Sequence, residues 1–398
     1  MSAQLKKIEA QRNKSAGRKP GKPKPKAEDD DGIIRLHTIE KNTLIVPTSI
    51  NPAALSSNIQ NDIPVPANLI GNVLGMTIAF TCSNSTNANI VFPSFGAVDM
   101  IASIDQLLDG TRTPFVKHIK ETLLFCMRYL SPDEIATYKR GFMPPASRVL
   151  APGASYTFYL PLLNDPLVIN NVLMLGFREL ITYRIYFQSN SWPGVIPTMS
   201  NFQLIARHSM PNAENLANMR RMYASNILSF PYHQYLEHNG ASQVIAPSAT
   251  VTFNLTQFRG LSSDIMVYVR GVGSIKISDL SQVIDQYSLI DVHDNTIMGL
   301  QNCDVAYYNS ILSASHKIRS VVDASLPDPW IGINLSSDVK NDYLTGSVSG
   351  YYNFTGNEKL VLKFKSSLVA GAYVISVVQG KRLEFNLRGG EVNLLTGM

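Results

Sequence analysis

The sequence predicts an all-β protein with two consecutive β-sandwich domains, a few short helical insertions and an extended N-terminal arm. Three observations predict this fold class. The length of 398 residues exceeds the usual range of about 100–200 residues for one domain. Short β-branched and aromatic runs recur from Leu69 onward, each bounded by Asn, Gly, Pro or Ser. A segment rich in Lys, Pro and Gly precedes them and is typical of an arm.

The predicted arm covers residues 1–35 and holds most of the positive charge. Residues 1–26 contain one acid, Glu9, and nine basic residues: Lys6, Lys7, Arg12, Lys14, Arg18, Lys19, Lys22, Lys24 and Lys26. This segment is therefore +8, and because the whole chain is +5, residues 27–398 carry −3. We expect the arm to contact nucleic-acid phosphates or anionic lipid head groups, unless it is a solvated tail. Nucleic-acid recognition by the folded body is disfavoured.

The first domain is predicted over residues 36–198 and the second over residues 199–398. The first domain begins with an extended strap that contains a strand near Asn42–Val46. The other predicted strands share alternating or continuous apolar residues. They are 72–82, 89–95, 155–163, 179–188, 201–209, 250–258, 264–272, 359–364, 370–379 and 381–387.

Three insertions are predicted to be helical. Residues Thr113–Leu130 place apolar side chains on one helical face. A second helix begins at Ser131-Pro132-Asp133 and runs through Tyr138, because Ser is a good cap and Pro suits the first turn. Residues Asn212–Tyr223 are the third.

A short internal repeat supports two related domains. Val149–Leu160 (VLAPGASYTFYL) and Val244–Leu255 (VIAPSATVTFNL) match at seven of twelve positions. In both, a turn leads into a strand with apolar side chains on one face. The match either marks two copies of one domain or is convergence on a turn-plus-strand pattern. Its position in each half of the β-rich region favours the first interpretation.

No catalytic, cofactor-binding or metal-binding residue is predicted, and we expect a protein that is not an enzyme. GxSxG, P-loop and complete GxGxxG motifs are absent from the sequence. His233, Glu237 and His238 miss the spacing of zinc-binding helices and are expected in a loop. His293, between Asp291 and Asp294, is expected in a polar turn.

The cysteine and hydropathy patterns predict a chain with neither disulfides nor a membrane span. Cys82, Cys126 and Cys303 are scattered, without the spacing of a zinc site. No N-terminal signal sequence is expected, and no apolar run reaches the roughly 18–20 residues that a membrane helix needs.

Taken together, the sequence resembles the double jelly-roll major capsid proteins of the tectivirus, adenovirus and large DNA virus lineage. The resemblance covers roughly residues 33–398 and is one of pattern and order. It includes the strand that ends in Leu160-Pro161-Leu162, the following strand Leu180–Phe187, and the Asn353-Phe354 strand near the C-terminus. The arm is more basic than in compact phage members, and the chain has little room for tall loop towers.

The resemblance implies two consecutive jelly rolls and a structural role. It implies homotrimers with a pseudo-hexagonal outline that tile an icosahedral shell and contact neighbouring trimers and penton or minor capsid proteins. It also implies that the arm faces the interior, toward an internal membrane, the genome or minor capsid proteins. The expected location is the virion, assembled inside the host cell in the cytoplasm or nucleus. The low charged fraction of 16% fits a subunit surrounded by neighbours.

Two alternatives stay open from the sequence. A coat protein of a small icosahedral RNA virus would combine a basic RNA-binding arm, a shell domain and a protruding domain. A carbohydrate-binding or hydrolytic sandwich would need exposed aromatics or paired carboxylates. Trp192 and Trp330 are the only tryptophans, and no paired acid motif is present.

Overall fold

A computed structural model describes eighteen parts of the chain. These are residues 39–50, 60–65, 71–93, 96–108, 116–119, 132–170, 172, 174, 181–187, 192, 194–210, 213–225, 227–239, 243–272, 283–300, 330–336, 350–388 and 391–395. The chain divides into two compact units, residues 1–37 and 38–398, and every described residue belongs to the second unit.

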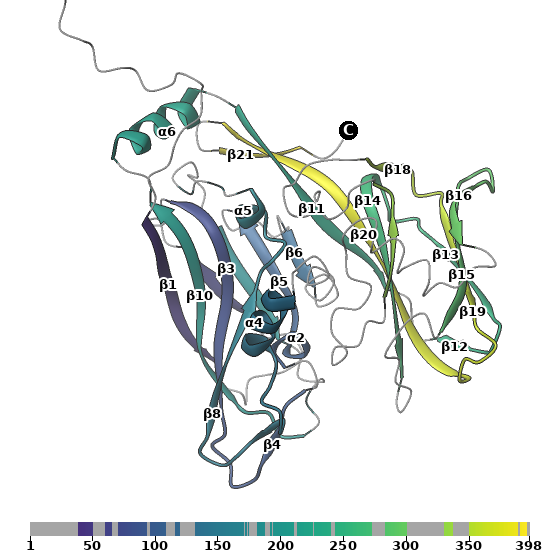
Figure 1. The fold of residues 1–398 in the computed structure, drawn as a ribbon, viewed down its shortest axis with the longest axis horizontal. Coiled ribbons are helices and arrows are strands. Elements are labelled where there is room, and N and C mark those ends of the chain that lie inside the picture. Colours follow the sequence, from purple (N-terminus) through teal and green to yellow (C-terminus); the bar gives the residue numbers. More distant parts are fainter. Residues whose placement is uncertain are drawn as a thin grey trace, which may run out of the picture. The chain divides into compact units, whose positions relative to one another are not determined.

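The first half of the described chain contains ten strands and three of its helices (Figure 1). The strands are β1 (Ile39–Ile50), β2 (Gln60–Pro64), β3 (Asn72–Ser83), β4 (Ile90–Val91), β5 (Ile101–Leu108), β6 (Val116–Ile119), β7 (Val149–Leu150), β8 (Ser155–Pro161), β9 (Ile181–Phe187) and β10 (Thr198–Met210). The helices are α2 (Ala97–Met100), α4 (Pro132–Phe142) and α5 (Pro166–Ile169).

The second half begins with α6 (Ala213–Ser225) and is otherwise built of strands. They are β11 (Ile227–Asn239), β12 (Gln243–Ile245), β13 (Thr250–Asn254), β14 (Gly260–Gly271), β15 (Ile284–Ile290), β16 (Thr296–Leu300), β17 (Trp330–Asn334), β18 (Tyr352–Phe354), β19 (Lys359–Phe364), β20 (Gly371–Arg388) and β21 (Glu391–Leu395). All ten predicted strand segments overlap observed strands.

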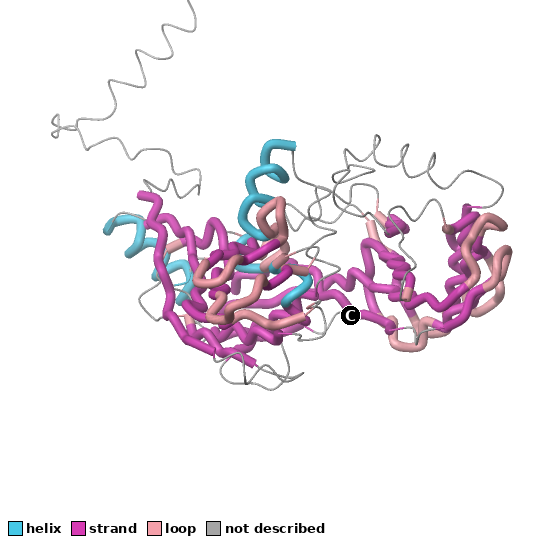
Figure 2. Tube along the Cα trace, turned by 90° about the horizontal axis from the view of Figure 1, so that it is seen from below, coloured by secondary structure: helices cyan, strands magenta, loops and turns pink. Residues whose placement is uncertain are grey.

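Both halves have the same strand order. Each contributes eight described strands to these sheets once β4 and β7, which pair only with each other, and β12, β18 and β21, which lie off the main path of their sheet, are set aside. The sheets are β1-β10-β3-β8 and β2-β9-β5-β6 in the first half, and β11-β20-β14-β17 and β13-β19-β15-β16 in the second. If the eight strands of each half are numbered 1 to 8 along the chain, the order across one sheet is 1-8-3-6 and across the other 2-7-4-5, in both halves. This is the eight-stranded, two-sheet jelly roll, and Figure 2 shows the sheets of the second half as separate layers.

The sequence repeat does not mark equivalent strands, so the interpretation that it marks two domain copies is wrong. Both copies do fold as strand, turn and strand. However, β8 is the sixth strand of its jelly roll and pairs with β3, whereas β13 is the second strand and pairs with β19. The match is therefore convergence on a turn-plus-strand pattern.

Alternation of side chains places a core between the two sheets of each jelly roll. In β9, every second residue is buried, as expected for a strand with one face on the core. The Phe80 ring of β3 lies 5.5 Å from the ring of Phe187 in β9, which belongs to the facing sheet. The second core is built in the same way around Tyr287, Leu362 and Tyr373.

Two of the three predicted helices are confirmed and one is contradicted where the structure describes it. Pro132 opens α4, with acids Asp133 and Glu134 in its first turn and bases in its last, as the helix dipole favours. The third predicted helix is α6. In the segment predicted as a helix from Thr113, residues Val116–Ile119 form strand β6 instead. Pairing with β5 overrode the helical periodicity there, and residues 120–130, with Cys126, lie outside the described residues.

Candidate functional site

The basic arm is the one site predicted from the sequence, and it lies outside the described residues. This applies to Lys6, Lys7, Arg12, Lys14, Arg18, Lys19, Lys22, Lys24 and Lys26. The arm's partners therefore stay predictions. The described part of the chain contains three other candidate sites: a buried polar cluster, a row of charged side chains and the outer faces of two equivalent sheets.

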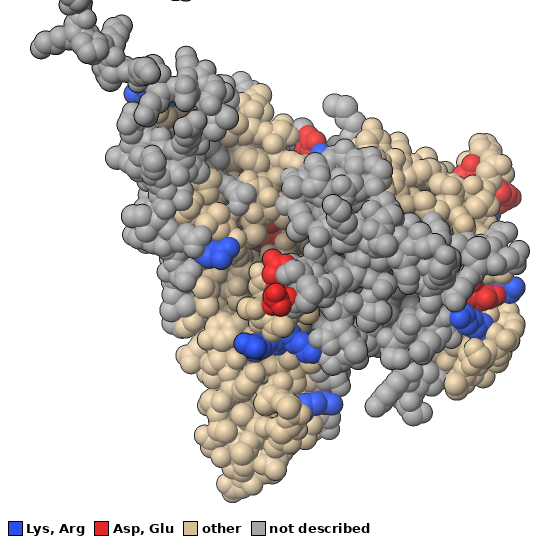
Figure 3. Space-filling view, viewed as in Figure 1, with Lys and Arg blue, Asp and Glu red and all other residues tan. Residues whose placement is uncertain are grey.

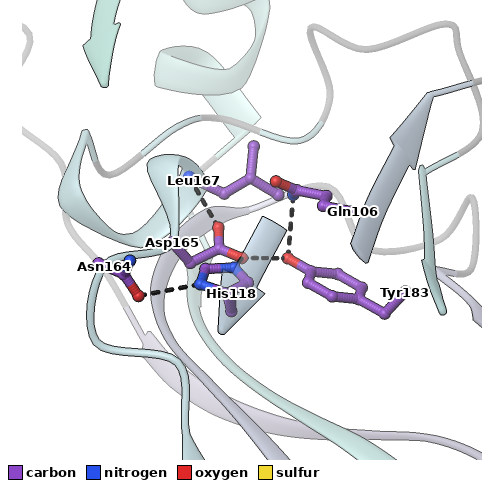
Figure 4. Close-up of polar contacts among 6 residues, drawn as sticks. All are labelled: Gln106, His118, Asn164, Asp165, Leu167 and Tyr183. Atoms are coloured by element: carbon purple, nitrogen blue, oxygen red, sulfur yellow. Dashed lines mark hydrogen bonds and ion pairs between the residues drawn. The ribbon is translucent and has the colours of Figure 1, made fainter. Parts of the chain in front are cut away.

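A cluster of polar side chains is sealed inside the first jelly roll (Figure 4). His118 of β6 lies with its Nδ1 2.9 Å from Oδ1 of Asn164, and its Nε2 is 3.7 Å from Oδ2 of Asp165. The hydroxyl of Tyr183 in β9 donates to the same Asp165 oxygen at 2.6 Å. Gln106 of β5 donates from Nε2 to the Tyr183 hydroxyl at 3.0 Å.

This cluster holds α5 against the sheet. Asp165 is the N-cap of α5, and its Oδ1 accepts the Leu167 amide at 2.9 Å while Pro166 occupies the first turn. Burial raises the pKa of Tyr183, and the neighbouring Asp165 carboxylate adds to the rise, so the phenol remains a donor. His118, Asp165 and Tyr183 are all fully buried. The arrangement can orient a helix but gives solvent no route to these groups.

The sequence contained part of the signal for this cluster. Asn164-Asp165-Pro166 has the capping pattern of a helix start, yet the helix is only four residues long. His118 lies in the segment Thr113–Leu130, which the sequence predicts as a helix, so the sequence does not indicate that His118 belongs to this cluster. In strand β6 the His118 side chain is buried, whereas the preceding Lys117 is exposed.

A row of alternating charges crosses the outer face of the sheet β2-β9-β5-β6. Asp62 pairs in register with Arg184, Arg184 with Asp105, and Asp105 with Lys117. Arg184 donates two hydrogen bonds to Asp62, from Nε to Oδ1 at 2.7 Å and from Nη2 to Oδ2 at 2.8 Å. Burial raises the pKa of Asp105, and Lys117 opposes this. Opposite charges on neighbouring strands stabilise the pairing, but the row has no net charge to attract a charged ligand.

Of the two histidines considered in the sequence, His233 does not lie in the predicted loop, whereas His293 lies in the predicted turn. His233 lies in β11, not in a loop, and is buried. Its pKa is lowered to about 4, chiefly by burial and also by Arg382 on the paired strand. His293 does lie in a turn, where Asp291 accepts the backbone amides of His293 and Asn295 at 2.8 Å each. Within the described residues, no group of three His, Cys, Asp or Glu side chains is arranged to hold a metal ion.

On β14 and β20, the outer face of the sheet β11-β20-β14-β17 is buried and combines the apolar Met266 and Val378 with the polar Asp264 and Ser376. In β14, Ile265, Val267 and Val269 point into the second core, whereas Met266 and Tyr268 belong to the cluster that contains the first core. β11 contacts β6 and α5 of the first jelly roll. Asn170 at the end of α5 donates from Nδ2 to the carbonyl of Pro231 at 2.8 Å. This sheet therefore contacts the first jelly roll within the same chain.

Over β10, β3 and β8, the outer face of the equivalent sheet is more polar. Thr81 and Thr157 share a hydroxyl–hydroxyl hydrogen bond of 3.0 Å, and Ser83 and Ser155 share one of 2.8 Å. Tyr159 on the same face is 45% exposed. Helix α4 covers part of the face and leaves a cavity of about 240 Å³ lined by residues of α4, β3, β8 and β10. Figure 3 shows that charged atoms are few on the described surface in that view.

No family model matches the sequence, and neither does any curated protein. The fold is nevertheless similar to solved viral structures. VP54 of the virus PBCV-1 is 12% identical, with a TM-score of 0.66, over 92% of this chain and 98% of VP54. The Faustovirus major capsid protein is 9% identical, with a TM-score of 0.57, over 96% and 97% of the two chains. For the mavirus major capsid protein the identity is 10%, the TM-score 0.52 and the coverage 96% and 97%.

At these identities the similarity shows the fold. It confirms the predicted fold class, an all-β chain of two consecutive jelly rolls, and the resemblance to the double jelly-roll capsid proteins. The similarity extends over nearly the full length of each of these chains, so both jelly rolls take part in it. Among the described helices, none is long and apolar enough to cross a membrane.

Proposed function

We propose that this chain is a structural major capsid protein of a virus, located in the virion and assembled inside the host cell. The observation that carries the proposal is the tandem of two jelly rolls with identical strand order in one chain. Two proteins that share this double fold over their full lengths are named as major capsid proteins. No enzymatic role is proposed, because the polar cluster that the structure brings together is sealed.

The proposed assembly unit is a homotrimer with a pseudo-hexagonal outline. Two similar sandwiches per chain give six similar units per trimer, and a closed ring obeys the symmetry of stable homo-oligomers. Such trimers would tile an icosahedral shell through contacts with neighbouring trimers and with penton or minor capsid proteins. Native mass spectrometry tests the trimer: we expect a species with three times the chain mass of 43.9 kDa. A protein that stays at the mass of one chain at all concentrations would contradict it.

The arm, residues 1–35, is proposed to face the interior, toward an internal membrane, the genome or minor capsid proteins. Its charge of +8 over residues 1–26 supports an anionic partner. We expect a chain lacking residues 1–31 to form folded trimers that assemble poorly into shells. Electron microscopy of assembly reactions, with vesicles of anionic lipid or with DNA added separately, distinguishes the partners. An unfolded or monomeric product would show that the arm belongs to the fold.

The boundary between the two jelly rolls is proposed to lie after Met210. The sequence pattern places it between residues 198 and 199, at the start of β10. β10 lies between β1 and β3 and is hydrogen-bonded to both, which supports its assignment to the first jelly roll. Limited proteolysis tests this: cleavage is expected near α6, and cleavage at residue 198 would support the boundary that the sequence pattern places there.

The RNA virus alternative has less support. A shell domain followed by a protruding domain does not require two jelly rolls with the same strand order, which this chain has. Particles that form only with RNA, from monomers or dimers, would favour that alternative.

A further inference from the structure

The row of alternating charges on the first jelly roll crosses a whole sheet. It consists of Asp62, Arg184, Asp105 and Lys117. Each lies on a different strand of the sheet β2-β9-β5-β6 and is paired in register with the next. Neighbouring strands lie about 4.8 Å apart, so the row is about 14 Å long. Since the chain is only 16% charged, these four side chains are a local concentration of charge.

The two ends of this row face solvent. Asp62 in β2 and Lys117 in β6 are exposed, and the side chain of Arg184 is 25% exposed. Asp105 is buried between its neighbours in the row. Although β6 contacts β11 of the second jelly roll, Lys117 remains exposed. The charged ends of the row are therefore accessible to another molecule.

The order of the charges, minus-plus-minus-plus, is complementary to its own reverse. A two-fold axis parallel to the strands, placed between two facing sheets, reverses the row of the second copy. Asp62 then lies opposite Lys117 of the second copy, and Lys117 lies opposite its Asp62. Each Arg184 lies opposite an Asp105. A two-fold axis along the row would instead place like charges opposite each other, so the pattern selects one orientation of the two copies.

We propose that the outer face of the sheet β2-β9-β5-β6 binds the same face of a second copy of this chain, around a two-fold axis parallel to the strands. The inference rests on the proposed capsid function, because it assigns this face to the contact between neighbouring assembly units of the shell. Facing sheets lie about 10 Å apart, a distance that the side chains of Asp62 and Lys117 bridge together. The row has no net charge, so it fits a surface with the same alternation and not a polyanion.

Each such contact is weak on its own. The ion pairs at the ends of the row are exposed and are screened by salt. A shell repeats one two-fold contact many times, so weak contacts hold neighbouring units together while single units stay soluble. We expect added salt to weaken the association between units, as it does for exposed charges and not for apolar surfaces. Wild-type units that never associate at low salt would contradict the proposal.

Charge reversal at the two ends of the row tests the contact. Lys117→Glu places Glu opposite Asp62 of the second copy, and Asp62→Lys places Lys opposite its Lys117. In analytical ultracentrifugation at low salt, each variant alone should associate at least about tenfold more weakly than wild type, because like charges then face each other. An equimolar mixture of the two variants should associate as wild type does, because opposite charges face again. A mixture as weak as either variant alone would overturn the proposal.

A matched control separates this row from surface charge in general. Lys359 in the second jelly roll forms the same kind of exposed ion pair, with Asp294. Lys359→Glu should therefore associate as wild type does, and an equal loss in this variant would overturn the assignment to the row. Circular dichroism and thermal unfolding verify that the variants fold, since Asp62→Lys also removes the ion pair with Arg184 inside the chain.

A second test needs no variant. A carbodiimide couples a lysine amine to a carboxylate in contact with it, and a mixture of isotopically light and heavy protein identifies links between chains. We expect a link between Lys117 of one isotope and Asp62 of the other. Within one chain these residues lie at opposite ends of the row, about 14 Å apart, which is too far for such a link. Absence of this link from associated wild-type protein would overturn the contact.

This contact and the proposed trimer can fail separately. If the link between Lys117 and Asp62 forms but wild-type protein never reaches the mass of three chains, the trimer is wrong and the contact is supported. If the three-chain species forms without the link, only the contact is wrong.

Discussion

The two jelly rolls share a strand order but differ in how they use the outer face of the same sheet. In the second jelly roll, Met266, Tyr268 and Val378 on this face are buried in the cluster that contains the first core. In the first jelly roll, Ser, Thr and the half-exposed Tyr159 occupy it. A contact that forms once, during folding of one chain, can be strongly apolar. A face that stays partly exposed to solvent keeps hydroxyl groups, because a large exposed apolar patch promotes association.

The largest effect is expected from truncating this buried face. Met266→Ala should lower the free energy of unfolding by about 3 kcal/mol, since Met266 is fully buried and its removal leaves a cavity. Ile205→Ala, on the equivalent face of the first jelly roll, should cost about 1 kcal/mol because Ile205 is only half-buried. Urea unfolding measures both, and equal losses would contradict the difference between the two faces.

A pH effect of similar size is expected at the junction strand β11. The pKa of His233 is about 4 in the folded chain against 6.5 for an ordinary histidine. Between these values the unfolded chain binds more protons, so stability is complete above pH 6.5 and falls as pH drops toward 4. The loss is about 3 kcal/mol.

This prediction is checked by unfolding His233→Gln at pH 7 and pH 5. We expect the variant to lose less stability on acidification than wild type. His293→Gln, in an exposed turn, is the matched control. An acid sensitivity that survives intact in His233→Gln would show that other groups cause it.

A smaller effect is expected from adding one methyl group to each outer face. In Gly380→Ala the new Cβ would overlap the carboxyl group of the buried Asp264, so this side chain must move, at a cost of about 2 kcal/mol. In Gly75→Ala the nearest atom would be 3.8 Å away, in the Arg207 side chain, so little change is expected. Thermal unfolding compares them. A tolerated Gly380→Ala would show that the second face is loosely packed.

The smallest effect concerns the charge row on the first jelly roll. Arg184→Ala should cost about 0.5 kcal/mol, because its ion pair with Asp62 is partly exposed and screened by solvent. A double-mutant cycle with Asp62→Asn isolates the pair. A coupling energy several times larger than about 0.5 kcal/mol would contradict the expectation that this exposed ion pair contributes little to stability.

Strands are predictable where one or both faces are buried, because alternation or continuous apolar runs mark them. The segment Gly371–Arg388 is predicted as two runs because polar residues near Gly380 and Lys381 interrupt the apolar pattern. The sequence indicates a loop at β11 because the buried face of this strand carries Tyr and His rather than aliphatic residues. The sequence indicates a helix at β6, because the alternating pattern of a four-residue strand is too short to stand out against the helical pattern of the longer segment around it.

The candidate surfaces are less predictable than the strands. A jelly roll pairs strands that lie far apart in the chain, so the outer face that carries Thr77, Tyr159 and Ile205 comes from three distant segments. No local pattern brings them together. The internal repeat indicates two domains, but the strand pairing does not support the reason. VLAPGASYTFYL and VIAPSATVTFNL lie in strands that are not equivalent in the two jelly rolls.

The proposed trimeric capsid subunit is tested by the solution mass of the intact chain, measured by native mass spectrometry across a range of concentrations. We expect a stable species of three chains, each of 43.9 kDa, with no stable dimer. A chain that remains at 43.9 kDa, or that forms only dimers, would contradict a trimeric capsid subunit.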